Sequence, residues 1–340
     1  MPSPADATAG PAADGRGVDA DLARVGVLAV VGDLVEDIVV WADEPLRVAT
    51  DTAARIFRAR GGSAANVAAL AAPLVPTRFI GRVGADAAGE ALVRDLASVG
   101  VDVRVQRDGR TGTVVLLIDA EGERTMFPDR AASARLHGVE AVWLDGIAWL
   151  HLPAYGLERE PMRGELPRLA ALARAGGARV SVDASSTGLL AGLGVDAALD
   201  LFRAIAPDVL FANEDEAVLL GLAGGGVVAA SVAPTVVVKH GALPTDLIVC
   251  GALADRVDVA PVAEIRDLTG AGDAFAAGYL AAVLRGADAA AACLAGHASA
   301  ASVLTNPGAH ADSNALGAQS PSGRNSRSVT PSHDRRADDP

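Results

Sequence analysis

The chain has 340 residues, enough for one large domain or two and for a sizeable core. Its formal net charge of −13 at pH 7 argues against an electrostatic nucleic-acid binder, which needs a basic face. Hydrophobic residues make up 51% and aromatic residues only 3%, so the core must be built from Ala, Val and Leu, as in parallel sheets covered by helices.

The two ends of the chain differ in composition from its middle. Residues 1–24 and 311–340 are small and polar without periodicity, which predicts disordered tails around a domain at 25–310. No apolar run approaches the ~18 residues of a membrane span, and the N-terminus lacks the pattern of a secretory signal. We therefore expect a cytoplasmic protein with no membrane partner.

Between the tails, apolar runs of strand length alternate with Ala/Leu-rich helical stretches. This alternation is typical of a parallel sheet wrapped by helices and predicts an α/β fold, a doubly wound sandwich. Cys250 and Cys293 lie in apolar surroundings without metal-site spacing, so both are predicted to be core thiols.

The first strand, at 25–31, ends in Gly32-Asp33, and Asp37 follows shortly after. Polar residues at the carboxyl end of such a strand lie where open α/β sheets bind ligands. Asp37 could therefore hold substrate hydroxyls. The alternative is a solvated loop carboxylate.

Two stretches, about 37–60 and 101–127, alternate loosely between apolar and polar residues. They predict short antiparallel strands outside the main sheet. Together they could form a small β lid that excludes water from a reaction and contacts substrate.

Gly61 and Gly62 open a Gly-Gly-Ser-Ala-Ala-Asn segment before a predicted helix at 67–74. Two glycines let a backbone approach a ligand closely, and Asn66 offers a donor and an acceptor to a sugar. The alternative is a Gly-rich turn with an Asn on the helix surface.

Further along, His151 lies in a strand-like run at 147–152 and is predicted to be a core histidine, because no nucleophile motif accompanies it. A strand at 209–212 then ends in Asn213, with Glu216 three residues later. These groups suit water-mediated Mg²⁺ and phosphate contacts, or ordinary helix capping. The next strand delivers Lys239 and Gly241, where a Lys or backbone amides could meet nucleotide phosphates.

The segment from Asp267 to Asp273 reads Asp-Leu-Thr-Gly-Ala-Gly-Asp and runs into an apolar helix. Backbone N–H groups converge at such a helix start and favour an anion. A carboxylate inside an anion site is electrostatically unfavourable, so Asp273 suggests a general base for phosphoryl transfer. The alternative is that Asp273 caps the helix.

Taken together, the segments at 61–66, 213–216 and 267–273 resemble, in order, the motifs of the ribokinase-like, or PfkB, family of carbohydrate and nucleoside kinases. The resemblance covers about residues 25–310. It implies a three-layer α/β/α fold with a β-sheet lid, and transfer of the ATP γ-phosphate to a hydroxymethyl group. A P-loop kinase is disfavoured, because no GxxxxGK[ST] occurs.

The resemblance also implies roles for single residues. Asp273 would be the base, within an anion hole made by the amides of Gly270, Ala271 and Gly272. The sugar would be held by Asp37, Gly61, Gly62 and Asn66. ATP and Mg²⁺ would be organised by Asn213 and Glu216, with Glu216 reaching Mg²⁺ through water, and the nucleotide would be bordered by Lys239, Gly241 and Gly308. Asp267 matches a position that in some members helps bind an activating monovalent cation such as K⁺, and family members form homodimers through the lid.

Two residues depart from the family pattern. Leu268 stands where a small residue is usual, and Pro244 replaces a Gly of the nucleotide loop. Neither touches Asp273, so we expect activity, with nucleotide affinity in question. The main hypothesis is a sugar kinase, with Glu123-Arg124-Thr125 more like sugar kinases than adenosine kinases. The alternatives are a nucleoside kinase (adenosine or pseudouridine type) and a non-catalytic sugar- or nucleotide-binding protein.

Overall fold

The computed structural model describes residues 25–304, apart from 120–122, 263–264 and 266–267. The predicted tails therefore lie outside the described residues. Within these residues no helix combines the length and apolar character needed to cross a membrane.

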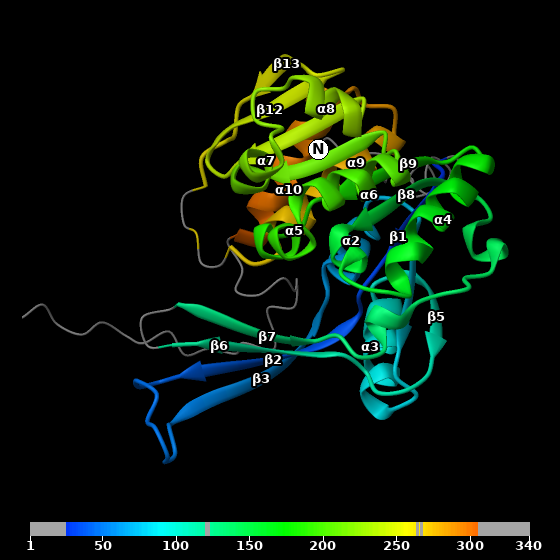
Figure 1. Ribbon diagram of the computed structural model, residues 1–340. Coiled ribbons are helices and arrows are strands. Elements are labelled where there is room, and N and C mark those ends of the chain that lie inside the picture. The colour runs from blue at the N-terminus through cyan, green and yellow to red at the C-terminus, as the bar shows by residue number, and fades with distance from the viewer. Residues whose placement is uncertain (1–24, 120–122, 263–264, 266–267, 305–340) are drawn as a thin grey trace, which may run out of the picture.

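A nine-stranded sheet forms the centre of the molecule (Figure 1). From one edge to the other its strands are β13 (Ala252–Val257), β12 (Leu243–Val249), β11 (Thr235–His240), β10 (Val209–Asn213), β9 (Arg179–Asp183), β8 (Ile147–Pro153), β1 (Val27–Val31), β4 (Thr77–Val83) and β5 (Asp102–Arg107). The seven strands from β11 to β5 pair in parallel, and β12 pairs antiparallel with both β11 and β13. The strand order reverses next to β1, which marks the place where open α/β sheets bind ligands.

Helices cover both faces of this sheet and define two apolar cores. One core packs beneath α2 (Ser63–Ala71), α3 (Ala87–Ser98), α9 (Ala271–Leu284) and α10 (Ala289–Leu304). The other packs beneath α4 (Met162–Ala175), α5 (Thr187–Leu193), α6 (Val195–Ile205), α7 (Glu214–Leu220) and α8 (Val227–Val232). Alternate strand residues feed the two cores, since Leu28 and Val30 join the first and Ala29 and Val31 the second. The predicted three-layer α/β/α sandwich is confirmed.

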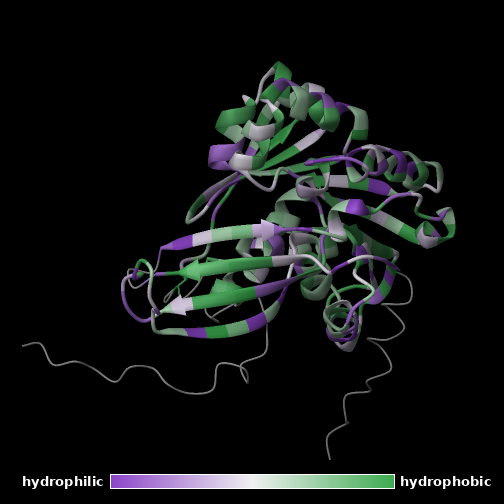
Figure 2. Ribbon diagram, turned by 60° about the horizontal axis from the view of Figure 1, so that its bottom comes forward, coloured by the Kyte–Doolittle hydropathy of each residue, from purple (hydrophilic) through white to green (hydrophobic). Residues whose placement is uncertain are grey.

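A second, four-stranded sheet projects from the main body (Figure 1). Its order is β3 (Ala54–Gly61), β2 (Val35–Ala42), β6 (Thr113–Ile118) and β7 (Arg124–Asp129). Figure 2 shows hydrophobic residues along the middle of this small sheet, where β2 and β6 lie. Asp37 on β2 is in register with Val114 on β6, and Arg124 on β7 is in register with Ile118 on β6. Val114 and Ile118 are an even number of residues apart on one strand, so Asp37 and Arg124 share one face of the sheet.

Some local predictions were wrong. The first part of the stretch at 101–127 is not in the small sheet, because β5 pairs with β4 at the edge of the large one. The small sheet is also not wholly antiparallel, since β2 and β6 pair in parallel. The helix after Gly62 begins at Ser63, not at residue 67. Cys293 is buried as predicted, but Cys250 is exposed in the turn between β12 and β13.

Candidate active site

The N-terminus of α9 has features that favour binding of an anion. Gly270 caps the helix with φ = 78°, in the left-handed region that favours glycine. The N–H of Ala271 donates to the Leu268 carbonyl at 3.3 Å. The amides of Gly272 and Asp273 also belong to the first turn, where N–H groups have no partner within a regular helix. The dipole of the 14-residue helix adds to the attraction of these donors for negative charge.

Asp273 does not cap this helix. No side-chain cap bond is formed at Gly270, and the Asp273 carboxylate turns instead toward α2. Ser63 Oγ donates to Asp273 Oδ1 at 2.6 Å, and Asn66 Nδ2 donates to Asp273 Oδ2 at 3.0 Å. The two donors hold a carboxylate at the mouth of an anion site, where electrostatics alone would disfavour it.

The environment of Asp273 changes its acidity. Burial raises the pKa of Asp273 to about 6, and the charge of Asp183 adds to the rise. The hydrogen bonds from Ser63 and Asn66 and the charge of Lys239 oppose it. A carboxylate with this pKa is mostly ionised at pH 7 and is a stronger base than an ordinary Asp.

Asn66 has one polar atom to spare. Its Oδ1 is buried and, in the described part of the chain, has no hydrogen-bond partner. Buried polar atoms are nearly always paired in proteins. An acceptor atom beside Asp273 therefore fits a ligand hydroxyl.

The Gly61-Gly62 pair is needed for steric reasons. A Cβ on Gly61 would lie 2.0 Å from Asp37 Oδ1, and a Cβ on Gly62 would lie 2.3 Å from the Asp33 carbonyl oxygen. Gly62 also has φ = 99°, which L side chains rarely adopt. The pair lets the end of β3 pass between two carboxylate residues and enter α2 at Ser63.

Asp37 on β2 lies against Gly61 and is partly buried. Burial raises the pKa of Asp37 to about 7, and the charge of Arg60 opposes the rise. A solvated loop carboxylate would not be shifted in this way. Since Ser63 binds Asp273 and Gly61 contacts Asp37, both carboxylates border the turn into α2.

Asn213 and Glu216 form a capping box at the start of α7. Asn213 Oδ1 accepts from the Glu216 N–H at 2.8 Å, and Glu216 Oε2 accepts from the Asn213 N–H at 2.9 Å. Glu216 is 3% exposed, and burial together with the charge of Asp183 raises its pKa. These hydrogen bonds show Asn213 and Glu216 capping α7, which is one of the two roles predicted for them from the sequence.

Lys239 is the second-last residue of β11 and is the register partner of Asn213 on β10. Its Nζ donates to Asp183 Oδ2 at 3.0 Å and lies 5.9 Å from the centre of the Phe275 ring. A Cβ on Gly272 would lie 3.5 Å from Lys239 Nζ, so the ammonium reaches the anion site of α9. Asp183 is the last residue of β9 and so a polar residue at the carboxyl end of a strand, but no role is predicted for it from the sequence.

Gly241 lies in the two-residue turn between β11 and β12, with φ = 64°. Pro244 is the second residue of β12, so the departure at this position falls in a strand and not in the turn. Leu268 is 67% exposed. Asp267 and Gly308 lie outside the described residues.

A further group of contacts, which no sequence motif predicts, begins at the end of β1. Arg130 forms an ion pair with Asp33, and its guanidinium lies 4.4 Å from the centre of the Tyr155 ring. The Tyr155 hydroxyl donates to the Ser185 carbonyl at 3.1 Å. Asp33 Oδ1 is buried and has no partner within the described residues.

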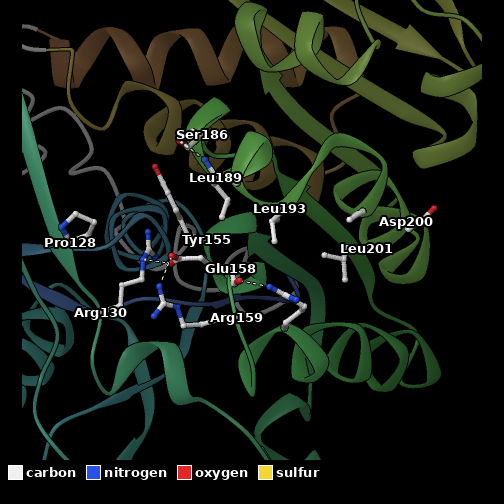
Figure 3. Close-up of a pocket in the computed structure, with 14 residues that line it drawn as sticks. Pro128, Arg130, Tyr155, Glu158, Arg159, Ser186, Leu189, Leu193, Asp200 and Leu201 are labelled. Atoms are coloured by element: carbon white, nitrogen blue, oxygen red, sulfur yellow. Dashed lines mark hydrogen bonds and ion pairs between the residues drawn. The ribbon is translucent and has the colours of Figure 1, made fainter.

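A pocket of about 1160 Å³ opens beside this group. Figure 3 shows Arg130, Tyr155 and Glu158 on one side of it, with Ser186 and Leu189 from the α5 region opposite. Ser186 caps α5 and follows the Asp183-to-Ser185 turn directly. The pocket therefore borders the same turn as the ion pair of Lys239.

The charges of the site suit a nucleotide phosphate. The start of α9 and the Lys239 ammonium attract an anion. Among the described residues, no three His, Cys, Asp or Glu side chains are grouped to hold a metal ion.

Known proteins similar to this chain include carbohydrate kinases. The model of the pfkB carbohydrate kinase family matches residues 27–315. The chain is 34% identical over 272 residues to a fructokinase of Klebsiella pneumoniae, which covers 75% of this chain and 84% of that protein. It is 34% identical over 244 residues to an ATP-dependent ribose-1-phosphate kinase of Halopiger xanaduensis, covering 67% of this chain and 74% of that protein.

Among solved structures, a ribokinase of Arabidopsis thaliana complexed with ribose and ATP superposes with a TM-score of 0.69. It is 23% identical, and the match covers 84% of this chain and 94% of that one. At this identity the likeness supports the fold alone.

Proposed function

The chain belongs to the pfkB family of carbohydrate kinases, and from this membership we propose that it transfers the γ-phosphate of ATP to a hydroxymethyl group of a small sugar, with Asp273 as the general base. The family's enzymes are phosphotransferases with an alcohol acceptor, and this chain is such an enzyme. The observation that carries the proposal is the Asp273 carboxylate, which Ser63 and Asn66 hold at the start of α9 in place of a helix cap.

In the proposed reaction, Asp273 takes the proton from the acceptor hydroxyl as the hydroxyl oxygen attacks the γ-phosphorus. Asn66 Oδ1, the unpartnered acceptor, can hold another hydroxyl of the sugar. The backbone amides from Gly270 to Asp273 stabilise charge on the transferring group. All these groups belong to α2 and α9, two helices packed on the same face of the sheet, so they are positioned together.

ATP and Mg²⁺ are the cofactors that the family implies. When bound, Mg²⁺ neutralises charge on the β- and γ-phosphate oxygens. We place the phosphates between α9 and Lys239, with Asn213 and Glu216 behind the metal's water and Gly241 beside the nucleotide. Gly308 beside the adenine and a K⁺ site at Asp267 are part of the same proposal.

The acceptor side is proposed at Asp37 and the Gly61-Gly62 turn. A fructokinase and a ribose-1-phosphate kinase among the relatives make small sugars and sugar phosphates the first candidates. The pocket beside Arg130 and Tyr155 is lined by neither Asp37 nor the Gly61-Gly62 turn, so it is a separate hollow from the place proposed for the acceptor.

We propose that the small sheet is the lid over the acceptor. Asp37 and Arg124 lie on one face of it, and Arg124 donates to Thr269 Oγ1 in the loop before α9. Met126, on the same face, is 58% exposed. Apolar side chains exposed on the small sheet also suit pairing with a second copy, and we propose a homodimer through the lid in a cytoplasmic enzyme.

A panel of acceptors tests the proposed function. Purified protein is given ATP, Mg²⁺ and in turn fructose, ribose, ribose 1-phosphate, a ketodeoxy sugar acid, adenosine, inosine and pseudouridine, and ADP formation is followed. Turnover of a sugar at least tenfold above every nucleoside supports the proposal. Preference for a nucleoside assigns the chain to nucleoside kinases, and sugar binding by calorimetry without any turnover makes it a binding protein.

A further inference from the structure

The ion pair between Asp183 and Lys239 connects two strand ends below the anion site. Their side chains are 15% and 16% exposed, and Asp183 Oδ2 accepts from Lys239 Nζ at 3.0 Å. Such a pair costs desolvation of both charges, so it is weak evidence for a purely stabilising role. Its position suggests a function instead.

Three neighbours fix the direction of the Lys239 ammonium. The Asp183 carboxylate binds it on one side, the Phe275 ring lies 5.9 Å away, and the backbone of Gly272 leaves open the side toward the start of α9. Gly272 is exposed, so this opening leads to the place where an anion would lie against the helix. A side chain at position 272 would come to 3.5 Å of Nζ at its first atom.

The charges around Lys239 make its ammonium important for binding a phosphate. Despite burial, the carboxylates of Asp183, Glu216 and Asp273 keep the pKa of Lys239 above its ordinary value. These three acids would repel a nucleotide phosphate, and Lys239 is the cation among them. An ammonium that swung away would leave the negative groups facing the ligand.

Asp183 itself is held rigidly. Its Oδ1 accepts from the Ser185 N–H at 2.8 Å, closing a turn in which Ser185 has φ = 71°. The N–H of Ala184 donates to the Phe211 carbonyl at 2.9 Å, which ties the turn to β10. One carboxylate oxygen thus fixes the turn, and the other is left for Lys239.

We propose that Asp183 is a positioning residue, which holds the Lys239 ammonium at the N-terminus of α9 so that it contacts the γ-phosphate of ATP during transfer. The inference rests on the proposed function. Asp183 acts only through Lys239 and touches neither substrate. The Asn side chain can keep the Ser185 hydrogen bond, so Asp183→Asn removes the charge and leaves the turn in place.

A double-mutant cycle tests this role, using Asp183→Asn, Lys239→Met and the double variant. We expect Lys239→Met to lower kcat about a hundredfold, as when one donor to a developing charge is removed. Asp183→Asn should lower kcat about tenfold, and the double variant should resemble Lys239→Met within about threefold, because the second change then has nothing left to act on. A structural role for Asp183 would instead lower kcat by the same factor in both backgrounds.

Affinity for ATP, measured by calorimetry on all four proteins, gives a second cycle that does not depend on turnover. The single variants should each bind ATP more weakly than wild type. The double variant should bind ATP about as weakly as Lys239→Met, because the two losses of affinity do not add. The double variant removes both charges of the pair and leaves neither Asp183 nor Lys239 without its partner, so it should fold even if a single variant does not. The control is Asp102→Asn, which breaks the 2.7 Å ion pair with Arg78 at the far edge of the sheet and should leave both quantities unchanged.

The two proposals fail in different ways. If the wild-type protein phosphorylates no acceptor, the proposed function is wrong, while the ATP affinities still decide the role of Asp183. If Lys239→Met binds ATP and turns over like wild type, or if the two losses multiply in the double variant, the positioning role is wrong.

Discussion

Replacing Asp273 by Asn removes the proposed base and keeps the shape of the side chain. The amide oxygen can still accept from Ser63, while the hydrogen bond from Asn66 Nδ2 is lost, so the start of α9 should keep its structure through Ser63. A positioned general base contributes about 10² to 10⁴ in rate. We expect kcat to fall about a thousandfold, with the KM for the sugar changed by less than about threefold, because the lost interaction acts in the transition state.

The pH dependence makes this prediction sharper. The pKa of Asp273 is about 6, and the reaction needs its ionised form, so kcat of the wild-type protein should decline as the pH falls through 6. At pH 5 it should be roughly a tenth of its plateau. Asp37 also titrates in this range, with a pKa of about 7, so the profile is measured at saturating sugar, which occupies Asp37 in the proposed complex.

The assay is ADP release coupled to a dye, at pH 4.5 to 9, for wild type, Asp273→Asn and the control Asp102→Asn. The residual activity of Asp273→Asn should lack the decline near pH 6. If Asp273→Asn keeps more than a tenth of wild-type kcat, or shows the same acid limb, another group accepts the proton and the reasoning is wrong.

Three further changes test the surroundings of Asp273. Ser63→Ala removes a hydrogen bond that lowers the pKa of Asp273, so the acid limb of kcat should move to higher pH, and an unmoved limb would contradict the contact. Asp37→Asn should raise the sugar KM at least tenfold. The folded-state pKa of Asp37 is raised from 3.8 to about 7, so ionisation of Asp37 lowers the free energy of unfolding. This loss grows as the pH rises from about 4 to 7 and is complete above that. Asp37→Asn should therefore stabilise the protein by up to about 4 kcal/mol at pH 8 and by almost nothing at pH 3, as urea titrations would show. Gly62→Ala places a Cβ 2.3 Å from the Asp33 carbonyl oxygen at φ = 99°, so it should lower the melting temperature and kcat together, and wild-type values for both would contradict the close approach.

Local patterns in the sequence predict the main elements of the fold and the start of α9. Small residues before an apolar run indicate a helix N-terminus, and Asp273 stands inside it. The hydrogen-bond partners of Asp273 cannot be predicted in this way. Ser63 lies 210 residues away, and only the packing of α2 against α9 brings it to the carboxylate. A serine within a Gly-rich segment has no local feature that predicts such a contact.

The same distinction explains the residues that sequence reasoning missed. Asp183 ends a buried strand, as Asn213 does, and this signal would have identified it as a site residue. Arg130 follows β7 without any pattern, and its ion pair with Asp33 depends on how the small sheet meets the large one. No local signal predicts a contact of that kind.

The errors in the fold have physical causes too. Strand β5 alternates between apolar and polar residues because an edge strand is half exposed, so it looked like part of the small sheet. The parallel pairing of β2 with β6 joins residues 77 positions apart, such as Glu36 and Thr113, and no pattern within either strand predicts it. Cys250 has apolar neighbours because it lies between two strands, but its turn, with φ = 48°, exposes it.

The most direct test of the central claim is to identify the product. Wild-type protein is incubated with ATP, Mg²⁺ and fructose, and ³¹P NMR follows the phosphorus signals. The account predicts that a sugar phosphate ester appears in a one-to-one ratio with ADP, and that Asp273→Asn forms it about a thousandfold more slowly. ADP accompanied by free phosphate and no ester, with fructose and with every other acceptor of the panel, would contradict it.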